Sequence, residues 1–150
     1  MSSSSSAADV LSKAEKVRRF GEVFTPEHIV RDMCDMLERE SPGCFEPETS
    51  FLEPSCGDGA FVLEILRRKF ANCRKRVDYT AALDSVWGFE LQADNVQACI
   101  ENVTELVRQY IHPTATELGI IRDHIIQCDG LKVMKLVKWC GDRDAAQGDS

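Results

Sequence analysis

The segment from Phe51 to Phe70 constrains the fold more than any other part of this sequence. A short apolar strand is predicted at Ser50 to Glu53, followed by a turn of small residues at Pro54 to Gly59. A helix is then predicted from about Ala60 to Phe70, and its inward face carries Phe61, Val62, Ile65 and Leu66. A strand, a glycine turn and a helix in this order indicate an α/β protein.

The rest of the chain repeats this alternation. A second strand is predicted at Ser85 to Leu91, a long helix at Ala93 to about Ile111, and a third strand at His124 to Cys128. The basic, polar stretch Asn72 to Asp78 is expected to be a connection, and Leu131 to Trp139 fits a short helix better than a strand. Crossovers longer than a dozen residues favour parallel strands with helices on the sheet faces.

Two helices are predicted before the first strand. Residues 1–20 are expected to form a flexible serine-rich tail and a short helix from Ala7 to Phe20, whose one apolar face carries Val10, Leu11, Ala14 and Val17. Its cluster of Lys16, Arg18 and Arg19 is interpreted as a solvated face. The next helix runs to about Glu40, with Thr25 as N-cap and Pro26 at its first position. Its apolar stripe consists of Ile29, Val30, Met33, Cys34 and Leu37.

Composition narrows the class of protein further. With 150 residues the chain is expected to hold one domain, placed at residues 21–140, with a frayed tail at 141–150. The net charge of -7 argues against a broad basic surface for nucleic acid. The 7 cysteines form no Cys-x-x-Cys pair, so we expect free thiols in a cytoplasmic protein and no metal site. No apolar run is long enough for a membrane span.

Three acidic residues stand at the predicted ends of the three strands: Glu53, Glu90 and Asp129. Open parallel sheets bind ligands outside the carboxyl ends of their strands. Glu53 can hold a cationic group such as an ammonium, and Glu90 can accept hydrogen bonds from both hydroxyls of a ribose. Taken singly, each residue is also typical of a tight turn or a solvated strand end. Together with the glycines after Glu53, they outline a nucleoside site.

Four segments of the chain resemble, in order, the N-terminal half of an S-adenosylmethionine-dependent N6-adenine DNA methyltransferase of the restriction-modification type. They are GEVFTPEHIV from Gly21, FLEPSCGDGAFVLEIL from Phe51, GFELQADNV from Gly88 and QCDGL from Gln127. The similarity spans about Gly21 to Leu131. It implies a Rossmann-like class I methyltransferase fold, with a truncated parallel sheet flanked by helices, and S-adenosylmethionine as cofactor.

The resemblance also implies roles for individual residues. Phe24 and Thr25 resemble the motif that closes over the methionine end of the cofactor, and Glu53 resembles the acid that holds its ammonium. Glu90 would bind the ribose, with Leu91 against the adenine, and Asp129 would accept from the adenine amino group. The full cofactor-binding set is Phe24, Thr25, Glu53, Pro54, Ser55, Gly57, Asp58, Gly59, Glu90, Leu91, Asp129 and Gly130.

One departure from that family limits what the chain is expected to do. Its members carry an Asn/Asp-Pro-Pro-Tyr/Phe tetrapeptide that binds the flipped target base, whereas the 5 prolines of this chain are scattered and no Pro-Pro occurs. No catalytic residue is therefore assigned, and DNA is expected to be reached only through a missing domain or a partner subunit.

Two other hypotheses stay open. In the first, the chain is one half of a split methyltransferase. In the second, it is a non-catalytic interaction or accessory protein with a methyltransferase-like fold. A sheet that stops after its third strand would expose apolar surface and unpaired backbone, which predicts self-association or a partner protein at that edge.

Overall fold

The computed structural model of this protein describes residues 24–136. The predicted tail and short helix of residues 1–20, and the predicted frayed tail of residues 141–150, lie outside the described residues.

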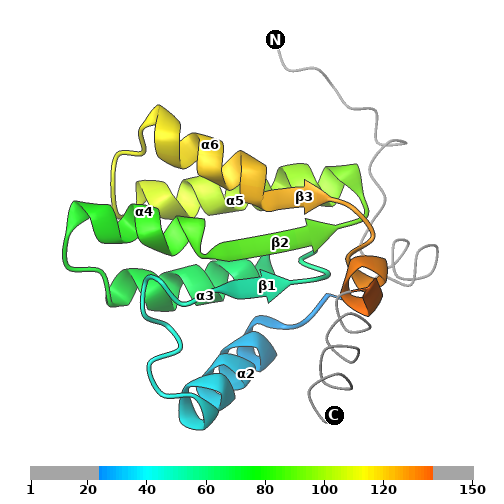
Figure 1. Ribbon diagram of the computed structural model, residues 1–150, viewed down its shortest axis with the longest axis horizontal. Helices are drawn as coiled ribbons and strands as arrows, with labels where there is room; N and C mark the ends of the chain where they lie inside the picture. Colours follow the sequence, from blue (N-terminus) through cyan, green and yellow to red (C-terminus); the bar gives the residue numbers. More distant parts are fainter. Residues whose placement is uncertain (1–23, 137–150) are drawn as a thin grey trace, which may run out of the picture.

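The centre of the structure is a three-stranded parallel sheet in the order β1-β2-β3 (Figure 1). The strands are β1 (Phe51–Glu53), β2 (Val86–Glu90) and β3 (Ile125–Gln127). Phe51 is the register partner of Val86, and Gly88 is the partner of Ile125. The predicted α/β class and the predicted parallel strands are therefore confirmed, with each predicted strand shortened by a residue or two at its ends.

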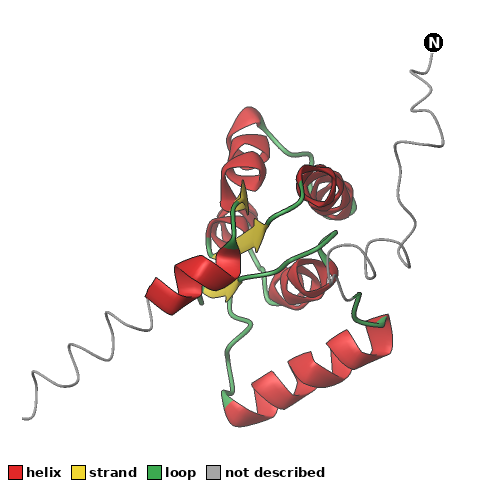
Figure 2. Cartoon of the chain, turned by 90° about the vertical axis from the view of Figure 1, so that its right-hand side faces the viewer, coloured by secondary structure: helices red, strands yellow, loops and turns green. Residues whose placement is uncertain are grey.

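Helices lie on one face of this sheet and at both of its ends. α3 (Ala60–Ala71) and α5 (Ala93–Arg108) lie side by side behind the strands in Figure 1, and Figure 2 shows both on the same side of the sheet. α4 (Arg76–Asp84) and α6 (Ala115–His124) lead directly into the N-terminal ends of β2 and β3. α2 (Glu27–Glu40) packs against α3, and residues 130–136 are helical after β3.

Two of these helices were not predicted. α4 begins near the end of the stretch expected to be a connection and runs on to Asp84. The Asp78 carboxylate accepts hydrogen bonds from the backbone N–H groups of Arg74 and Lys75 and so caps the start of this helix. α6 begins with a capping box between Thr114 and Glu117. The Thr-x-x-Glu spacing of this box is a recognisable sequence signal for a helix start, but the spacing of apolar residues does not display it.

The start of α2 also differs from the prediction. Thr25 was expected to be the N-cap, but Pro26 occupies that position with an extended backbone (φ -58°, ψ 146°). Its carbonyl oxygen accepts hydrogen bonds from the N–H groups of Ile29 and Val30, at 3.0 and 3.1 Å. Thr25 thus lies one residue before the cap, and its side chain remains available to the pocket described below. The predicted end of this helix near Glu40 is confirmed.

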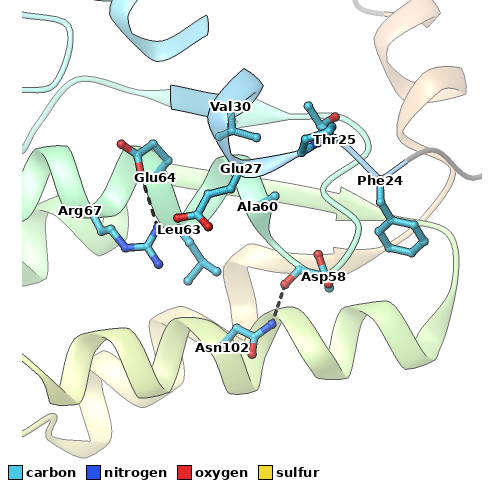
Figure 3. A pocket seen from close by; sticks show the side chains of 11 residues that line it. Phe24, Thr25, Glu27, Val30, Asp58, Ala60, Leu63, Glu64, Arg67 and Asn102 are labelled. Atoms are coloured by element: carbon cyan, nitrogen blue, oxygen red, sulfur yellow. Dashed lines mark hydrogen bonds and ion pairs between the residues drawn. The ribbon is translucent and has the colours of Figure 1, made fainter. Parts of the chain in front are cut away.

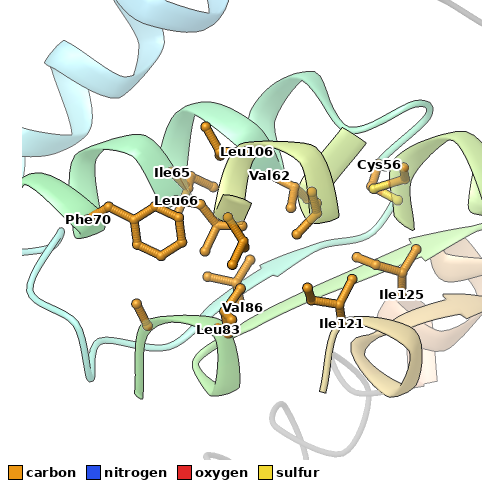
Figure 4. Packing of buried hydrophobic residues seen from close by; sticks show 14 of the residues in the cluster. Cys56, Val62, Ile65, Leu66, Phe70, Leu83, Val86, Leu106, Ile121 and Ile125 are labelled. Atoms are coloured by element: carbon orange, nitrogen blue, oxygen red, sulfur yellow. The ribbon is translucent and has the colours of Figure 1, made fainter. Parts of the chain in front are cut away.

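The core lies between the sheet and the pair α3 and α5 (Figure 4). It is built from the buried apolar side chains of Val62, Ile65, Leu66, Phe70, Leu83, Val86, Val103, Leu106, Val107, Ile121 and Ile125. These positions recur every three or four residues on the helices, which explains why periodicity alone located α3 and α5.

A buried lysine joins this core to the loop before β1. Lys69 on α3 is fully buried, and its Nζ donates hydrogen bonds to the carbonyl oxygens of Glu46, Pro47 and Thr49 at 2.7, 3.2 and 2.5 Å. Burial lowers the pKa of its ammonium group to about 8. These hydrogen bonds fix the loop of residues 46–49, which precedes β1, against α3.

The opposite face of the sheet is apolar and uncovered within the described residues. Strand alternation and register put Leu52, Trp87, Phe89 and Ile126 on this face. Leu52 is 43% exposed, Trp87 37% and Ile126 36%, although the Trp87 ring stacks on His124. The expectation that helices cover both faces is therefore met on one face only in this part of the chain.

Candidate functional site

Glu53 and Glu90 lie near each other at the carboxyl ends of β1 and β2. Glu53 is the register partner of Gly88, and Glu90 lies two residues further along β2 on the same face. One strand spacing and a two-residue advance separate their Cα atoms by about 8 Å. Two neighbouring carboxylates on one face can bind two separate donor groups of a single small ligand.

The Glu53 carboxylate is partly buried without a cationic partner. It accepts a hydrogen bond from the backbone N–H of Ser55 at 3.1 Å, and no described residue forms an ion pair with it. Burial raises the pKa of this carboxyl group, and the Ser55 hydrogen bond offsets only part of that effect. A bound cation would therefore stabilise the charged form of Glu53.

Glu90 is buried, at 5% exposure, so the alternative of a solvated strand-end charge is wrong for this residue. Its Oε2 accepts a hydrogen bond from the backbone N–H of Gln92 at 3.1 Å, which orients the carboxylate at the turn into α5. Leu91, the next residue, is 62% exposed, so most of its surface is not covered by other described residues. A planar ligand could cover it.

The turn between β1 and α3 requires glycine at two positions because of its backbone angles, and at one of them there is also little room for a side chain. Gly57 has φ +55° and Gly59 has φ +106°, a backbone region that favours glycine. A Cβ atom on Gly59 would lie 3.0 Å from the Cys99 Sγ, so the turn also sits tightly against α5. The Cys56 N–H donates to the Phe89 carbonyl oxygen at 2.8 Å and ties the turn to β2.

Cys56 has a packing role. A hydrogen bond with the side chain of Cys99 and burial both raise the pKa of the Cys56 thiol. A thiol held in its neutral form is a poor nucleophile, which agrees with a small residue that fills a tight turn.

The third predicted acid, Asp129, has a local structural role. Its Oδ1 accepts a hydrogen bond from the N–H of Lys132 at 3.2 Å and caps the helix of residues 130–136. Gly130 packs against the first turn so closely that a Cβ atom there would lie 1.9 Å from the Pro54 carbonyl oxygen. The loops after β1 and β3 are thereby brought together at the same end of the sheet as Glu90.

A pocket of about 430 Å³ lies beside the glycine turn (Figure 3). It brings together Phe24 and Thr25, which precede α2, and Asp58 in the turn, although these residues are far apart in the sequence. Figure 3 shows Phe24 and Asp58 on the same side of this pocket. Glu53, Glu90 and Asp129 do not line it, so the predicted residues divide between this pocket and the adjoining strand ends.

Four polar residues that line the pocket were not predicted from the sequence as site residues: Glu27, Glu64, Arg67 and Asn102. The Asn102 Nδ2 donates to the Asp58 carbonyl oxygen at 3.0 Å and so fixes the glycine turn on α5. Arg67 pairs with Glu64 at 3.4 Å. The i, i+3 spacing of that pair on one helix was a detectable signal, whereas nothing local to α5 distinguishes Asn102.

Within residues 24–136, no cluster of three or more His, Cys, Asp or Glu side chains has the arrangement of a metal site. No helix in that range combines the length and apolar composition that crossing a membrane requires. Comparisons of the chain with protein-family models, with curated proteins and with solved structures found no match.

Proposed function

We propose that this chain is the S-adenosylmethionine-binding part of an adenine-N6 DNA methyltransferase of the restriction-modification type. The observation that carries the proposal is the pair of buried or partly buried carboxylates, Glu53 and Glu90, on one face of adjacent strand ends. The positive-φ glycine turn connects β1, which ends at Glu53, to α3. The finer fold assignment, a Rossmann-like class I methyltransferase fold to which the three described strands belong, is part of the same proposal.

The chemistry of each carboxylate fits one part of this cofactor. Glu53 has no described cationic partner, and an ammonium group would supply one. The Glu90 carboxylate has two oxygens at the end of the next strand. Its Oε2 accepts a hydrogen bond from the backbone N–H of Gln92, and the carboxylate can accept further hydrogen bonds from ribose hydroxyls. The exposed Leu91 side chain supplies an apolar contact for a purine.

In this proposal Phe24 and Thr25 contact the methionine end from the pocket beside the turn, while Glu53 binds its ammonium group from the strand end outside that pocket. The pocket volume of about 430 Å³ lies within the usual range for small-molecule sites. The N-terminus of α3 opens from Gly59 without a side-chain cap, and a helix N-terminus favours a negatively charged group such as a carboxylate. When bound, S-adenosylmethionine supplies an electrophilic methyl group, and the residues of this chain bind and orient it.

The proposal assigns no catalytic residue to this chain. Its sequence holds no Pro-Pro tetrapeptide, so the group that receives the target base must come from another polypeptide segment. We therefore expect no methyl transfer to DNA by the chain alone. Asp129 enters the proposal as a weaker contact, because its Oδ1 already accepts the Lys132 N–H.

Titration calorimetry of the chain with S-adenosylmethionine and S-adenosylhomocysteine tests the proposal. We expect micromolar binding that Glu53→Gln and Glu90→Gln each weaken at least about tenfold, because each removes a charged acceptor. Glu48→Gln, at an exposed position just before β1, is the matched control and should bind like the parent chain. Absence of binding by a chain that circular dichroism shows to be folded would contradict the proposal.

A further inference from the structure

α2 carries an apolar stripe that the rest of the described chain covers only in part. Val30 and Cys34 are buried against the core, at 1% and 0% exposure. The adjoining half of the same stripe is exposed: Ile29 is 39% accessible, Met33 46%, Met36 54% and Leu37 42%. These four residues recur at i, i+4, i+7 and i+8, which places them on one side of the helix. This side, Ile29, Met33, Met36 and Leu37, is called here the open stripe.

The spacing of the open stripe suits a second helix. Helical residues at these intervals form the seam into which the side chains of a neighbouring antiparallel or parallel helix insert. The polar residues of α2, which include Arg31, Asp35 and Glu38, lie on the other side of the helix and are exposed. The open stripe therefore has the form of half of a helix pair.

We propose that residues 7–20 of this chain form a helix that packs antiparallel to α2 on the open stripe. The sequence of this segment has one apolar face of its own, made of Val10, Leu11, Ala14 and Val17. The segment and α2 have the same length of 14 residues, about 21 Å as helices. Only residues 21–26 separate them, and consecutive helices joined by so short a connection are usually antiparallel neighbours.

The register of the two apolar faces agrees with this pairing. If Phe20 lies opposite Glu27, the antiparallel alignment puts Ala14 opposite Met33. It also puts Leu11 opposite Met36 and Val10 opposite Leu37. The small Ala14 faces the long Met33, and larger side chains flank that contact, so the two faces interdigitate without a change in either helix.

The charges of the two helices are complementary. α2 carries more acidic than basic side chains, with Glu27, Asp32, Asp35, Glu38 and Glu40 against Arg31 and Arg39. The segment of residues 7–20 has the opposite balance, with Lys13, Lys16, Arg18 and Arg19 against Asp9 and Glu15. Opposite net charge favours this helix over a second copy of α2, which would bring two acidic helices together.

The pairing has a consequence for the pocket. Phe24 and Thr25 belong to the connection between the two helices, and both line the 430 Å³ pocket. A helix pair anchors that connection at both ends, so it would hold this wall of the pocket in place. The inference concerns the connection itself and does not depend on which ligand the pocket binds.

Hydrogen exchange on the full chain tests the pairing. We expect the amides of residues 10–20 to exchange at least about tenfold more slowly than those of a free peptide of residues 1–23, and the protection to be unchanged by dilution. The double variant Met33→Ser, Met36→Ser should abolish this protection while α3 and α5 stay protected. The matched control is His28→Ser, Arg39→Ser, on the polar side of α2, which should retain it.

Two outcomes would overturn the inference. Exchange of residues 10–20 at the rate of the free peptide would show that the segment does not pack on α2. Protection that is lost on dilution, together with a falling mass by light scattering, would assign the open stripe to contact between copies.

Discussion

At the residue scale, Gly130 is the glycine near the candidate site that leaves the least room for a side chain. A Cβ atom at this position would lie 1.9 Å from the Pro54 carbonyl oxygen and 2.9 Å from the Phe89 Cβ. The first of these neighbours is backbone, which cannot move aside as a flexible side chain can. The loop after β3 therefore needs glycine to reach the loop after β1, and this contact sets the position of Asp129.

We predict that Gly130→Ala lowers the free energy of unfolding by at least about 2 kcal/mol, because the methyl group displaces the Pro54 turn. Urea denaturation at neutral pH measures the effect. Gly119→Ala is the control: Gly119 lies within α6, and a Cβ atom there meets nothing within 4 Å. That change should stabilise the chain by up to about 1 kcal/mol through helix propensity. Equal stability of the Gly130 variant and the parent chain would disprove the close contact.

At the element scale, α6 shows how one buried carboxylate can fix a helix. The side chain of Glu117 is 4% exposed and lies 2.5 Å from the Arg76 guanidinium on α4. It also accepts hydrogen bonds from the backbone N–H of Thr114 at 3.0 Å, from the Thr114 hydroxyl and from the Thr80 hydroxyl. One side chain thus caps α6 and joins it to α4.

These contacts make the stability of the chain depend on acid pH. Burial alone would raise the pKa of Glu117, but the Thr114 hydrogen bonds and the Arg76 ion pair outweigh it and lower the pKa to about 2. In the unfolded chain the group titrates near pH 4.5. The unfolded state therefore binds more protons between these values, and the stabilisation is complete above about pH 4.5 and lost as pH falls toward 2.

We predict that Glu117→Gln lowers the free energy of unfolding by about 2 kcal/mol at pH 7, and that the difference from the parent chain vanishes as pH approaches 2. Urea denaturation of both proteins across this range gives the difference directly. Glu105→Gln, at an exposed position on α5, should show no such difference at any pH. A constant difference between parent and Glu117→Gln from pH 7 to pH 2 would contradict the assignment.

At the scale of the whole molecule, the sheet is covered on one face. Parallel sheets are normally buried on both faces. Here Leu52, Trp87, Phe89 and Ile126 form an apolar face without a described helix over it, and β1 pairs with β2 alone in the described sheet. Exposed apolar surface next to an unpaired strand edge favours association.

We predict that the chain associates through this face, so that its average mass by light scattering rises with concentration. Leu52→Lys places a charge on this face, on the edge strand β1, and should shift the association to at least about tenfold higher concentration. Val77→Lys introduces the same charge at an apolar residue that is 65% exposed on α4, away from the sheet, and should behave as the parent. A mass equal to that of the monomer at every concentration would refute the prediction.

Local sequence patterns by themselves determined the alternation of strands and helices in this protein. The 3.6-residue spacing of apolar residues located α3 and α5, and the strand, turn and helix around Gly57 and Gly59 indicated parallel strands with acids at their ends. Even the two helices that were missed have local signals, of which the Thr-x-x-Glu spacing at the start of α6 is the plainer. Such features depend on neighbours within a few residues, so the sequence displays them.

Only the tertiary structure decided which of these residues are buried and which meet. Glu90 is a buried acceptor, Asp129 a helix cap, and Asn102 a partner of the Asp58 carbonyl group, and none of these roles follows from the residues beside them in sequence. The same holds for the half-covered stripe of α2. Burial is set by surfaces that come from distant parts of the chain, and a sequence pattern shows that a face is apolar without showing what covers it.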